Sequence, residues 1–430
     1  MVPKAVAIAL AVATLVAACS SDDDGEPRGI AWRGDDPVVV VDRTASGVEF
    51  VAADDAGDDT DSAQEISLPI GVRGTLDGEA DIDTFRLEVD EGMHLSALVT
   101  GAEDIDLVLD VLDASGDRIV RSDRAPTGYS EGVPNLWLEP GTYFLQVLEF
   151  VRGERGGEGG RQGPSEPYEL VVQRYEHESG FEKEPNDELE RATPVDIGQD
   201  MFGYIGWHRD RDVWRVPLDG ALPTDGFRIA ISGVPWVTPE LEILGPDGEV
   251  VLTREGERGE PLYLHNLSPE HAFGGEERDV GAFYVAISSG RSNPEEPYRL
   301  RVRRRDMEPD SELEPNHEPS LATPLREDGG EREGRRRGHL DVGDVDMYRL
   351  SSSPGVRQLH AAVEPTSQMV AHLEVRIEGE EADSAQADAA GQRASVTGLE
   401  VPAGKEVVLV VSGQARDPRG APYELRWSVH

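Results

Sequence analysis

A group of oxygen-bearing side chains with recognisable spacing lies between residues 181 and 214, in the stretch FEKEPNDELERATPVDIGQDMFGYIGWHRDRDVW. A carboxylate-rich turn opens this stretch, and two aspartates separated by one residue, Asp210 and Asp212, close it. Grouped carboxylate and amide oxygens are the ligands that hard cations such as Ca²⁺ take. The same residue types also cap turns and solvate linkers. The stretch is therefore compatible with a cation site and with a merely acidic surface.

The same pattern occurs three times along the chain. The interval from an alanine to the second aspartate is 20 residues in two copies and 24 in the third, at Ala63 to Asp83, Ala192 to Asp212 and Ala322 to Asp346. A closing Pro-Tyr pair repeats independently at intervals of 130 and 125 residues, at Tyr168, Tyr298 and Tyr423. Matched spacing of two motifs predicts three homologous domains, with boundaries at 51–175, 176–305 and 306–430.

The elements that must position these acids are predicted to be strands. Phe85, Leu87 and Val89 alternate with polar residues, which is the period of a half-buried strand. Most other apolar stretches are equally short and end at Gly, Pro or Asp. We therefore predict an all-β fold of three tandem β-sandwiches. Trp207, Trp214 and Trp236 could line a ligand-binding face, but core packing is the favoured interpretation.

The charge balance limits the possible partners. The chain has 430 residues, with 41 basic against 85 acidic side chains and a net charge of −44. A repelling field of this size excludes nucleic acid as a partner, because phosphate contacts require clustered Arg and Lys. The two basic clusters, residues 303–305 and 335–337, are expected to be solvated loops paired with nearby acids.

The N-terminus has the features of an export signal. Lys4 precedes an apolar run, and small residues stand directly before Cys19, the only cysteine. This segment resembles a bacterial lipobox, which predicts a signal peptide over 1–18, lipidation of Cys19 and a polar, acidic tether over 19–50. Cell-envelope localisation with a lipid anchor, at the outer membrane, is the resulting expectation.

Together the motifs resemble a known family. Glu-x-Glu-Pro-Asn-Asp, an Ala-Thr pair, Asp-x-Asp-x-aromatic, a Pro-Asp-Gly turn and a closing Pro-Tyr-x-Leu strand are similar to the bacterial pre-peptidase C-terminal domain. The collagen-binding domains of secreted collagenases are similar to that family. The resemblance implies jelly-roll-like sandwiches that serve as non-catalytic accessories.

The resemblance also implies calcium ligands at matching positions. In the second domain they are Glu182, Glu184, Asn186, Asp187, Asp210 and Asp212. In the third they are Glu312, Glu314, Asn316, Asp344 and Asp346, and His317 replaces the acid at the position of Asp187. The first domain has Gly57 at the position of Asn186 and offers only Asp55, Asp58, Asp81 and Asp83. Calcium is accordingly expected least in the first domain.

Motifs for catalysis are missing from the sequence. It contains no Gly-x-Ser-x-Gly and no His-Glu-x-x-His motif, and Cys19 is assigned to lipidation. We therefore expect a non-enzymatic envelope lipoprotein, with possible Ca²⁺, that binds or presents an extracellular polymer or a protein partner. A structural spacer and a hydrolase with an unrecognised carboxylate site are the alternatives.

Overall fold

The computed structural model describes residues 48–430 apart from 54–55, 125–126, 152–160, 162, 275–280, 326–332, 352–354, 367, 416 and 418. The predicted signal peptide, Cys19 and nearly all of the tether lie outside the described residues, as does Asp55. Within the described residues, no helix has both the length and the apolar character needed to cross a membrane.

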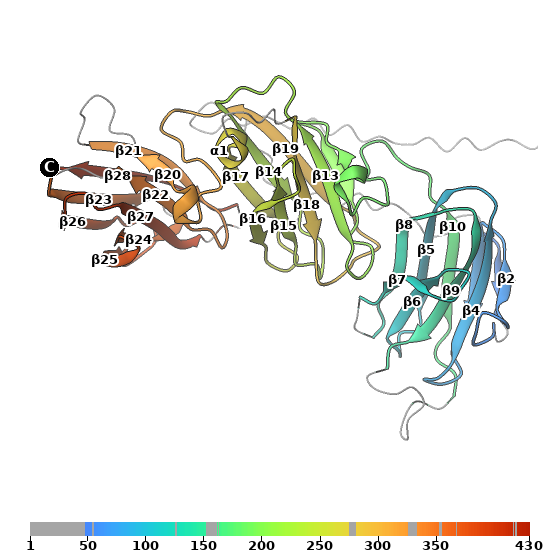
Figure 1. The fold of residues 1–430 in the computed structure, drawn as a ribbon. Coiled ribbons are helices and arrows are strands. Elements are labelled where there is room, and N and C mark those ends of the chain that lie inside the picture. Colours follow the sequence, from blue (N-terminus) through green and yellow to red (C-terminus); the bar gives the residue numbers. More distant parts are fainter. Residues whose placement is uncertain are drawn as a thin grey trace, which may run out of the picture. The chain divides into compact units, whose positions relative to one another are not determined.

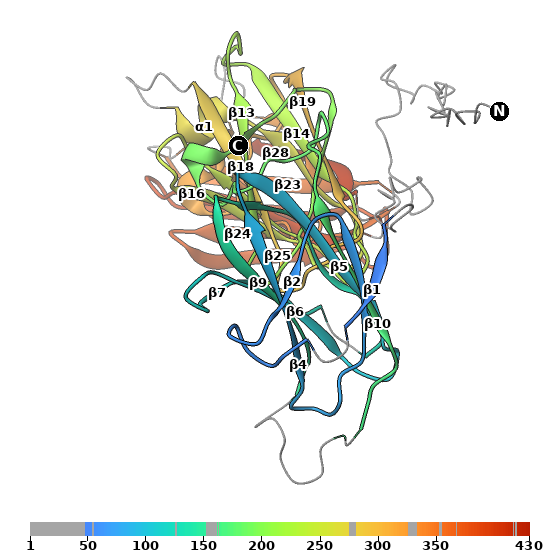
Figure 2. The same cartoon turned by 90° about the vertical axis from the view of Figure 1, so that its right-hand side faces the viewer.

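The first sandwich pairs two five-stranded sheets (Figures 1 and 2, blue to green strands). One sheet has the order β1 (Phe50–Ala52), β3 (Ile70–Gly74), β10 (Tyr168–Arg174), β5 (Met93–Gly101) and β8 (Glu131–Leu138). The other has the order β2 (Gln64–Ile66), β4 (Ile82–Val89), β9 (Gly141–Glu149), β6 (Leu107–Leu112) and β7 (Arg118–Ser122).

The second sandwich has a five-stranded and a four-stranded sheet. The first is ordered β11 (Thr193–Pro194), β13 (Arg211–Pro217), β18 (Ala282–Ser288), β15 (Glu240–Leu244) and β16 (Val250–Glu255). The second is ordered β12 (Asp200–Gly203), β19 (Tyr298–Asp306), β14 (Asp225–Ile231) and β17 (Leu262–Leu267). The short helix α1 (Pro269–Phe273) follows β17, and the 3₁₀ turn η1 (Leu189–Arg191) precedes β11.

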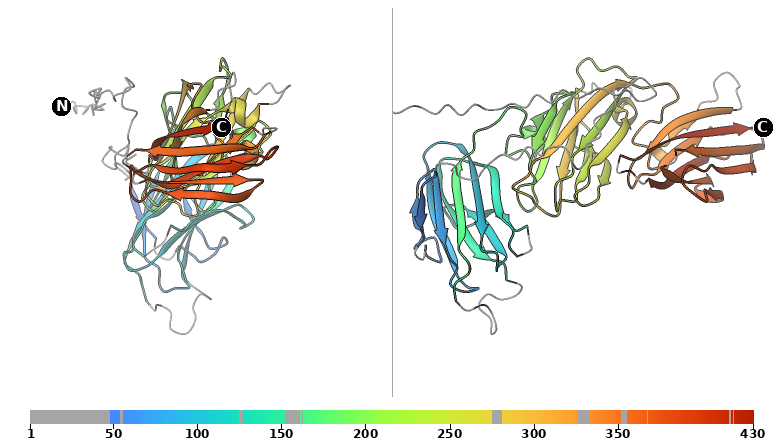
Figure 3. Two further views of the ribbon diagram at one scale, coloured as in Figure 1. Left: turned by 90° about the vertical axis from the view of Figure 1, so that its left-hand side faces the viewer. Right: turned by 180° about the vertical axis from the view of Figure 1, so that it is seen from behind.

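The third sandwich repeats this arrangement (Figure 3, orange to red strands). Its five-stranded sheet is ordered β20 (Thr323–Leu325), β22 (Asp346–Leu350), β27 (Val407–Ala415), β24 (Met369–Ile377) and β25 (Glu380–Gln386). Its four-stranded sheet is ordered β21 (Glu333–Leu340), β28 (Ala421–Val429), β23 (Arg357–Pro365) and β26 (Ala394–Val401), and η2 (Pro319–Leu321) precedes β20.

A short parallel edge strand marks the same point in each repeat. β2, β11 and β20 each pair in parallel with the strand that carries the acidic motif, β4, β13 and β22. The residue two places after the second aspartate then faces the edge strand in identical register, in the pairs Gln64–Phe85, Thr193–Trp214 and Thr323–Tyr348. The repeated sequence spacing thus corresponds to a repeated strand register.

Each pair of sheets encloses a core of its own. Alternating side chains point inward, and Phe85, Trp214 and Tyr348 are completely buried, one in each core. The burial of these apolar side chains between the two sheets is the main source of stability of each sandwich. The prediction of an all-β fold of several sandwiches is confirmed.

Both basic clusters lie on strands, and this corrects the expectation that they form loops. Residues 303–305 belong to β19, and residues 335–337 belong to β21. In β19 the buried Leu300 and Val302 point inward, and alternation along the strand places Arg303 and Arg305 on the outward face of the sheet. Arginine can occupy such positions because its aliphatic stem packs on the sheet while its charge stays accessible to water.

A buried acid in the first sandwich predicts an unusual pH dependence. Glu131 is fully buried, and burial raises the pKa of its carboxyl to about 8 from an ordinary 4.5, although Ser122 Oγ and the Arg124 amide donate to it. Because the folded carboxyl holds its proton more tightly, its stabilising contribution is complete below pH 4.5 and is lost as the pH rises through about 8.

Glu131→Gln should remove this dependence. The free energy of unfolding of the variant, taken relative to that of the wild type, is expected to increase as the pH rises from about 5 to about 9, because only the wild type loses stability when its carboxyl ionises. Differential scanning calorimetry of both proteins across that range measures the difference in transition temperature. A difference that stays constant with pH would contradict the prediction.

Candidate cation site

The acidic residues of the second repeat are gathered by backbone hydrogen bonds. The turn that carries Glu182, Glu184 and Asn186 lies against β12 and β13. The Glu182 amide donates to the Phe202 carbonyl at 2.8 Å, and the Val213 amide donates to the Asn186 carbonyl at 3.1 Å. Since Asp210 and Asp212 stand at the start of β13, these bonds bring five potential ligands together.

Each carboxylate has one oxygen fixed by a protein donor. The Tyr204 amide and Asn135 Nδ2 both donate to Glu182 Oε1 at 2.8 Å. The remaining carboxylates are held by one donor each, namely the Asn186 amide on Glu184 Oε2 (3.1 Å), the Gly206 amide on Asp210 Oδ2 (2.6 Å) and the Tyr298 hydroxyl on Asp212 Oδ2 (2.6 Å). These bonds fix the orientation of every acid in the cluster.

The second oxygen of each group has no hydrogen-bond partner among the described residues. The five buried oxygens are Glu182 Oε2, Glu184 Oε1, Asn186 Oδ1, Asp210 Oδ1 and Asp212 Oδ1. One oxygen each from Glu182, Glu184 and Asp212 lies within 4.8 Å of the others. Buried polar atoms are almost always satisfied in folded proteins. Five unsatisfied oxygens in one place therefore indicate a missing partner that accepts their lone pairs.

The electrostatics of the cluster point to a cation as that partner. All four carboxylates are at most 3% exposed, and no Arg, Lys or His among the described residues forms an ion pair with them. Burial raises the pKa of Glu182 to about 7, and burial together with neighbouring carboxylates raises the pKa of Glu184, Asp210 and Asp212. Several buried like charges are costly without a counter-charge.

The residues present fit calcium. Five oxygens, four of them from carboxylates, supply most of the 6–8 oxygen ligands that Ca²⁺ takes. Asp187 does not join this buried set, because its side chain is exposed and its backbone oxygen accepts a bond from Arg211 at 3.1 Å. Adjacent residues of a turn point in different directions, so spacing could not separate Asn186 from Asp187.

The third repeat gathers the equivalent residues with a different environment. Glu312, Glu314, Asn316, Asp344 and Asp346 are all buried. Three carboxylate oxygens have no hydrogen-bond partner among the described residues, namely Glu314 Oε1, Asp344 Oδ2 and Asp346 Oδ1, and these three residues each offer an oxygen within 4.8 Å of the others. The fourth carboxylate, Glu312, is satisfied because the Tyr348 hydroxyl donates to its Oε2 at 3.2 Å. In addition, an arginine of the second sandwich, Arg254, ion-pairs with Asp344.

The first repeat has no such cluster among its described residues. Asp83 is its one buried acid from the motif, and both of its oxygens have protein donors, the Ala56 amide and the Tyr168 hydroxyl. Asp81 is half-buried and Asp58 is exposed. A single carboxylate with both oxygens satisfied needs no cation.

Sequence reasoning missed the tyrosines that support these acids. In every repeat the tyrosine of the closing Pro-Tyr pair donates to the second aspartate of the acidic motif, in the pairs Tyr168–Asp83, Tyr298–Asp212 and Tyr423–Asp346. Both motifs were visible, and their joint recurrence was the signal that could have linked them. The contribution of Asn135, which comes from the preceding sandwich, had no such signal.

Tyr298→Phe tests this support. The Tyr298 hydroxyl donates to Asp212 and accepts a bond from Trp214 Nε1 at 2.8 Å, so its removal leaves two buried groups unpaired. We expect a loss of about 1–3 kcal/mol in the free energy of unfolding. Chemical denaturation measures it, with Tyr284→Phe on the outer patch beside Val213 as the control. Equal, negligible losses in both variants would contradict the prediction.

The tryptophans are mostly packed away from solvent, as favoured above. Trp214 is fully buried, and Trp207 packs against the core of the first sandwich. Trp236 is half-buried and makes an edge-to-face contact with Tyr129, with ring centroids 5.5 Å apart.

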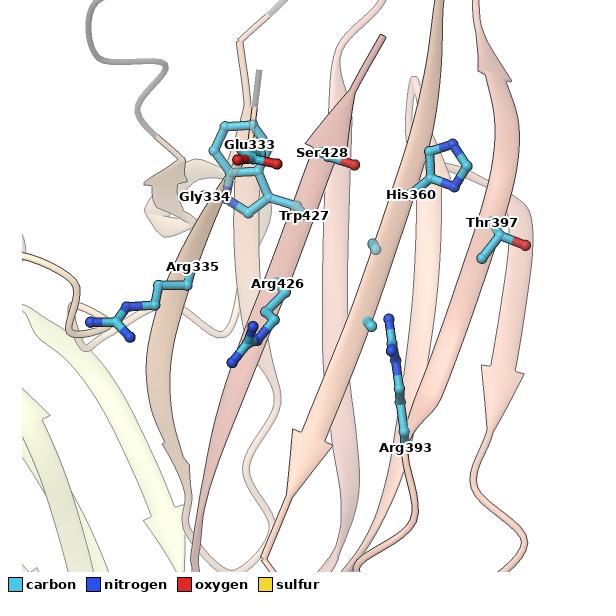
Figure 4. A pocket seen from close by; sticks show the side chains of 11 residues that line it. Glu333, Gly334, Arg335, His360, Arg393, Thr397, Arg426, Trp427 and Ser428 are labelled. Carbon is cyan, nitrogen blue, oxygen red and sulfur yellow. The ribbon is translucent and has the colours of Figure 1, made fainter. Parts of the chain in front are cut away.

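A separate hollow lies on the outward face of the four-stranded sheet in the third sandwich (Figure 4). It measures roughly 470 Å³, and Arg335, Arg393, Arg426 and His360 line it. Glu364 lies 3.5 Å from Arg426 and 3.9 Å from Arg393, so these guanidinium groups are partly neutralised. The hollow is a mixed-charge surface and not a concentrated anion site.

Comparisons with known proteins give little beyond this geometry. No family model matches the chain, and no curated protein matches it. Among solved structures, the chain is similar to the pre-peptidase C-terminal domain of a collagenase from Bacillus anthracis, with 20% identity, 26% of this chain and 93% of that chain covered, and a TM-score of 0.21. It is also similar to the PBSX exported protein XepA, with 9% identity, 54% and 84% covered, and a TM-score of 0.17. Likenesses this weak carry no argument about function.

Proposed function

We propose that this chain is a non-catalytic cell-envelope lipoprotein whose sandwich modules bind or present an extracellular polymer or protein, with calcium stabilising the second module. Five buried oxygens without hydrogen-bond partners carry the calcium part of the proposal; they belong to Glu182, Glu184, Asn186, Asp210 and Asp212, and those of Glu182, Glu184 and Asp212 lie within 4.8 Å of one another. When bound, Ca²⁺ supplies the charge that balances these buried carboxylates.

Burial of the acids speaks against a hydrolase that uses them. Glycoside hydrolysis needs two carboxyl groups that flank a bound substrate. Glu182, Glu184 and Asp212 are 1%, 3% and 0% exposed, so a polymer cannot contact their carboxylates. In this proposal they hold the module together and take no part in catalysis.

A structural spacer is the second candidate, and hydrogen bonds between neighbouring sandwiches favour it. Asn135 of β8 donates to Glu182, and Asn266, at the end of β17, donates to Glu312 at 2.7 Å. Such bonds restrict motion between modules, which suits a protein that separates envelope components. Pull-down of envelope polymers and proteins with the full chain distinguishes the two, because a spacer retains no specific ligand.

Isothermal titration calorimetry of the full chain with CaCl₂ at moderate salt tests the calcium proposal. We expect saturable binding at millimolar or lower concentration, which a matched MgCl₂ titration does not reproduce, because Mg²⁺ demands a tighter octahedral shell. Absence of saturable calcium binding would overturn it.

A further inference from the structure

An arginine of the second sandwich stands at the acidic cluster of the third. Arg254, on β16, is buried, and its Nη2 ion-pairs with Asp344 and lies 3.8 Å from Glu314 Oε2. A buried guanidinium is a permanent positive charge with several donors, and it matches carboxylates in geometry as well as in charge. Arg254 therefore supplies the third cluster with a cation that belongs to the protein.

Strand register identifies the equivalent position in the first sandwich. Arg254 of β16 pairs with Leu241 of β15, and Ser122 of β7 pairs with Leu109 of β6, in sheets of the same strand order. Ser122 carries no charge, and its hydroxyl donates to Glu131 at 2.7 Å. The first sandwich therefore offers a serine where the second offers an arginine.

Two supporting contacts are the same at the two clusters. Asn135 donates to Glu182 just as Asn266 donates to Glu312, and Tyr298 and Tyr423 support the equivalent aspartates. Four carboxylate oxygens have no partner at the second cluster and three at the third, because Tyr348 donates to Glu312 Oε2 only in the third. The difference in charge is larger, since Arg254 places a guanidinium beside Asp344 and Glu314 and no ion pair of the described residues reaches the second cluster.

We propose that the two homologous clusters are neutralised in different ways, by a divalent cation in the second sandwich and by Arg254 in the third. This inference rests on the proposed calcium site and replaces the metal predicted for the third repeat. The chain then binds one calcium ion, not two.

Because the two clusters are neutralised differently, the contact between the first and second sandwiches responds to calcium, and the contact between the second and third does not. Asn135 donates to Glu182, and His94 Nε2 contacts the Glu184 carbonyl at 2.9 Å, so the cation stabilises a segment that the first sandwich contacts. Arg254 and Asn266 hold the second and third sandwiches together without a metal. Calcium therefore regulates the contact between the first and second sandwiches alone.

Calcium stoichiometry of the full chain tests the proposal. Equilibrium dialysis with metal analysis should give one Ca²⁺ per wild-type chain and two per Arg254→Ser chain, because serine recreates the situation at Ser122. Asp212→Asn should bind none, and Asp212→Asn combined with Arg254→Ser should bind one. Arg121→Ser is the matched control, since it removes a β7 arginine that pairs with the single carboxylate of Asp110.

The variants separate this inference from the proposed function. Two ions bound by the wild type, or one ion retained by Asp212→Asn, would overturn the role of Arg254 while a calcium site remains. No calcium bound by the wild type, together with one gained by Arg254→Ser, would overturn the second-sandwich site and leave the role of Arg254 supported. If Arg254→Ser does not fold, Arg254→Lys keeps the charge, and one ion per chain is expected. A second ion in Arg254→Lys would contradict the proposal.

Discussion

Asp212→Asn is expected to abolish calcium-dependent stabilisation and, without calcium, to raise the stability of the second sandwich above that of the wild type. Asp212 is completely buried among Glu182, Glu184 and Asp210, so the neutral amide relieves repulsion when no cation is bound. With calcium the order reverses, because the variant loses a charged ligand. At one hundred times its dissociation constant, a ligand that binds only the folded state stabilises by about 2.7 kcal/mol.

Differential scanning calorimetry with calcium and with chelator, at fixed ionic strength, measures this reversal. Asp83→Asn is the control, because Asp83 holds the equivalent position in the first sandwich and already has two protein donors. Its calcium response should equal that of the wild type. If calcium stabilises Asp212→Asn as much as the wild type, the cation does not lie at this cluster. If monovalent salt alone stabilises both, the acids form a salt-dependent surface and the spacer interpretation gains support.

Arg254→Ser is expected to destabilise the third sandwich by about 3–5 kcal/mol in the absence of divalent cations, because removal of one partner leaves buried charges uncompensated. The Arg254 and Asp344 side chains are 7% and 0% exposed, so water screens the pair little. Added calcium should recover part of the loss in the variant and change this sandwich little in the wild type.

Hydrogen exchange followed by mass spectrometry locates the effect. Peptides from β22 and the segment 312–317 should lose protection in Arg254→Ser, and peptides from β4 in the first sandwich should not. Arg254→Lys should lose less, since it keeps the charge but not the forked geometry of the guanidinium. Unchanged protection around Asp344 would show that the ion pair does not stabilise this sandwich.

Alternation and repetition made much of the fold predictable. Period-two patterns such as Phe85, Leu87 and Val89 determine which face of a strand is buried, and these residues are indeed buried in β4. The recurring Asp-x-Asp-x-aromatic motif placed an acidic residue and a core residue two positions apart on one strand. The prediction of loops was wrong for residues 303–305 and 335–337, which lie on strands. A run of arginines has the composition of a solvated loop, and only the structure shows that an inward-facing neighbour such as Val302 holds the segment in the sheet.

The candidate site was likewise predictable only in part. By itself the sequence determined that acidic residues of two segments recur with fixed spacing, because short-range spacing and a common strand register are local properties. Only the tertiary structure decided that Asp187 faces solvent, that Tyr298 supports Asp212 from 86 residues away, and that Arg254 reaches Asp344 across 90 residues. The reason is physical: the need for a cation depends on which buried charges remain uncompensated, and compensation comes from whichever chain segments the folded sheets bring into contact.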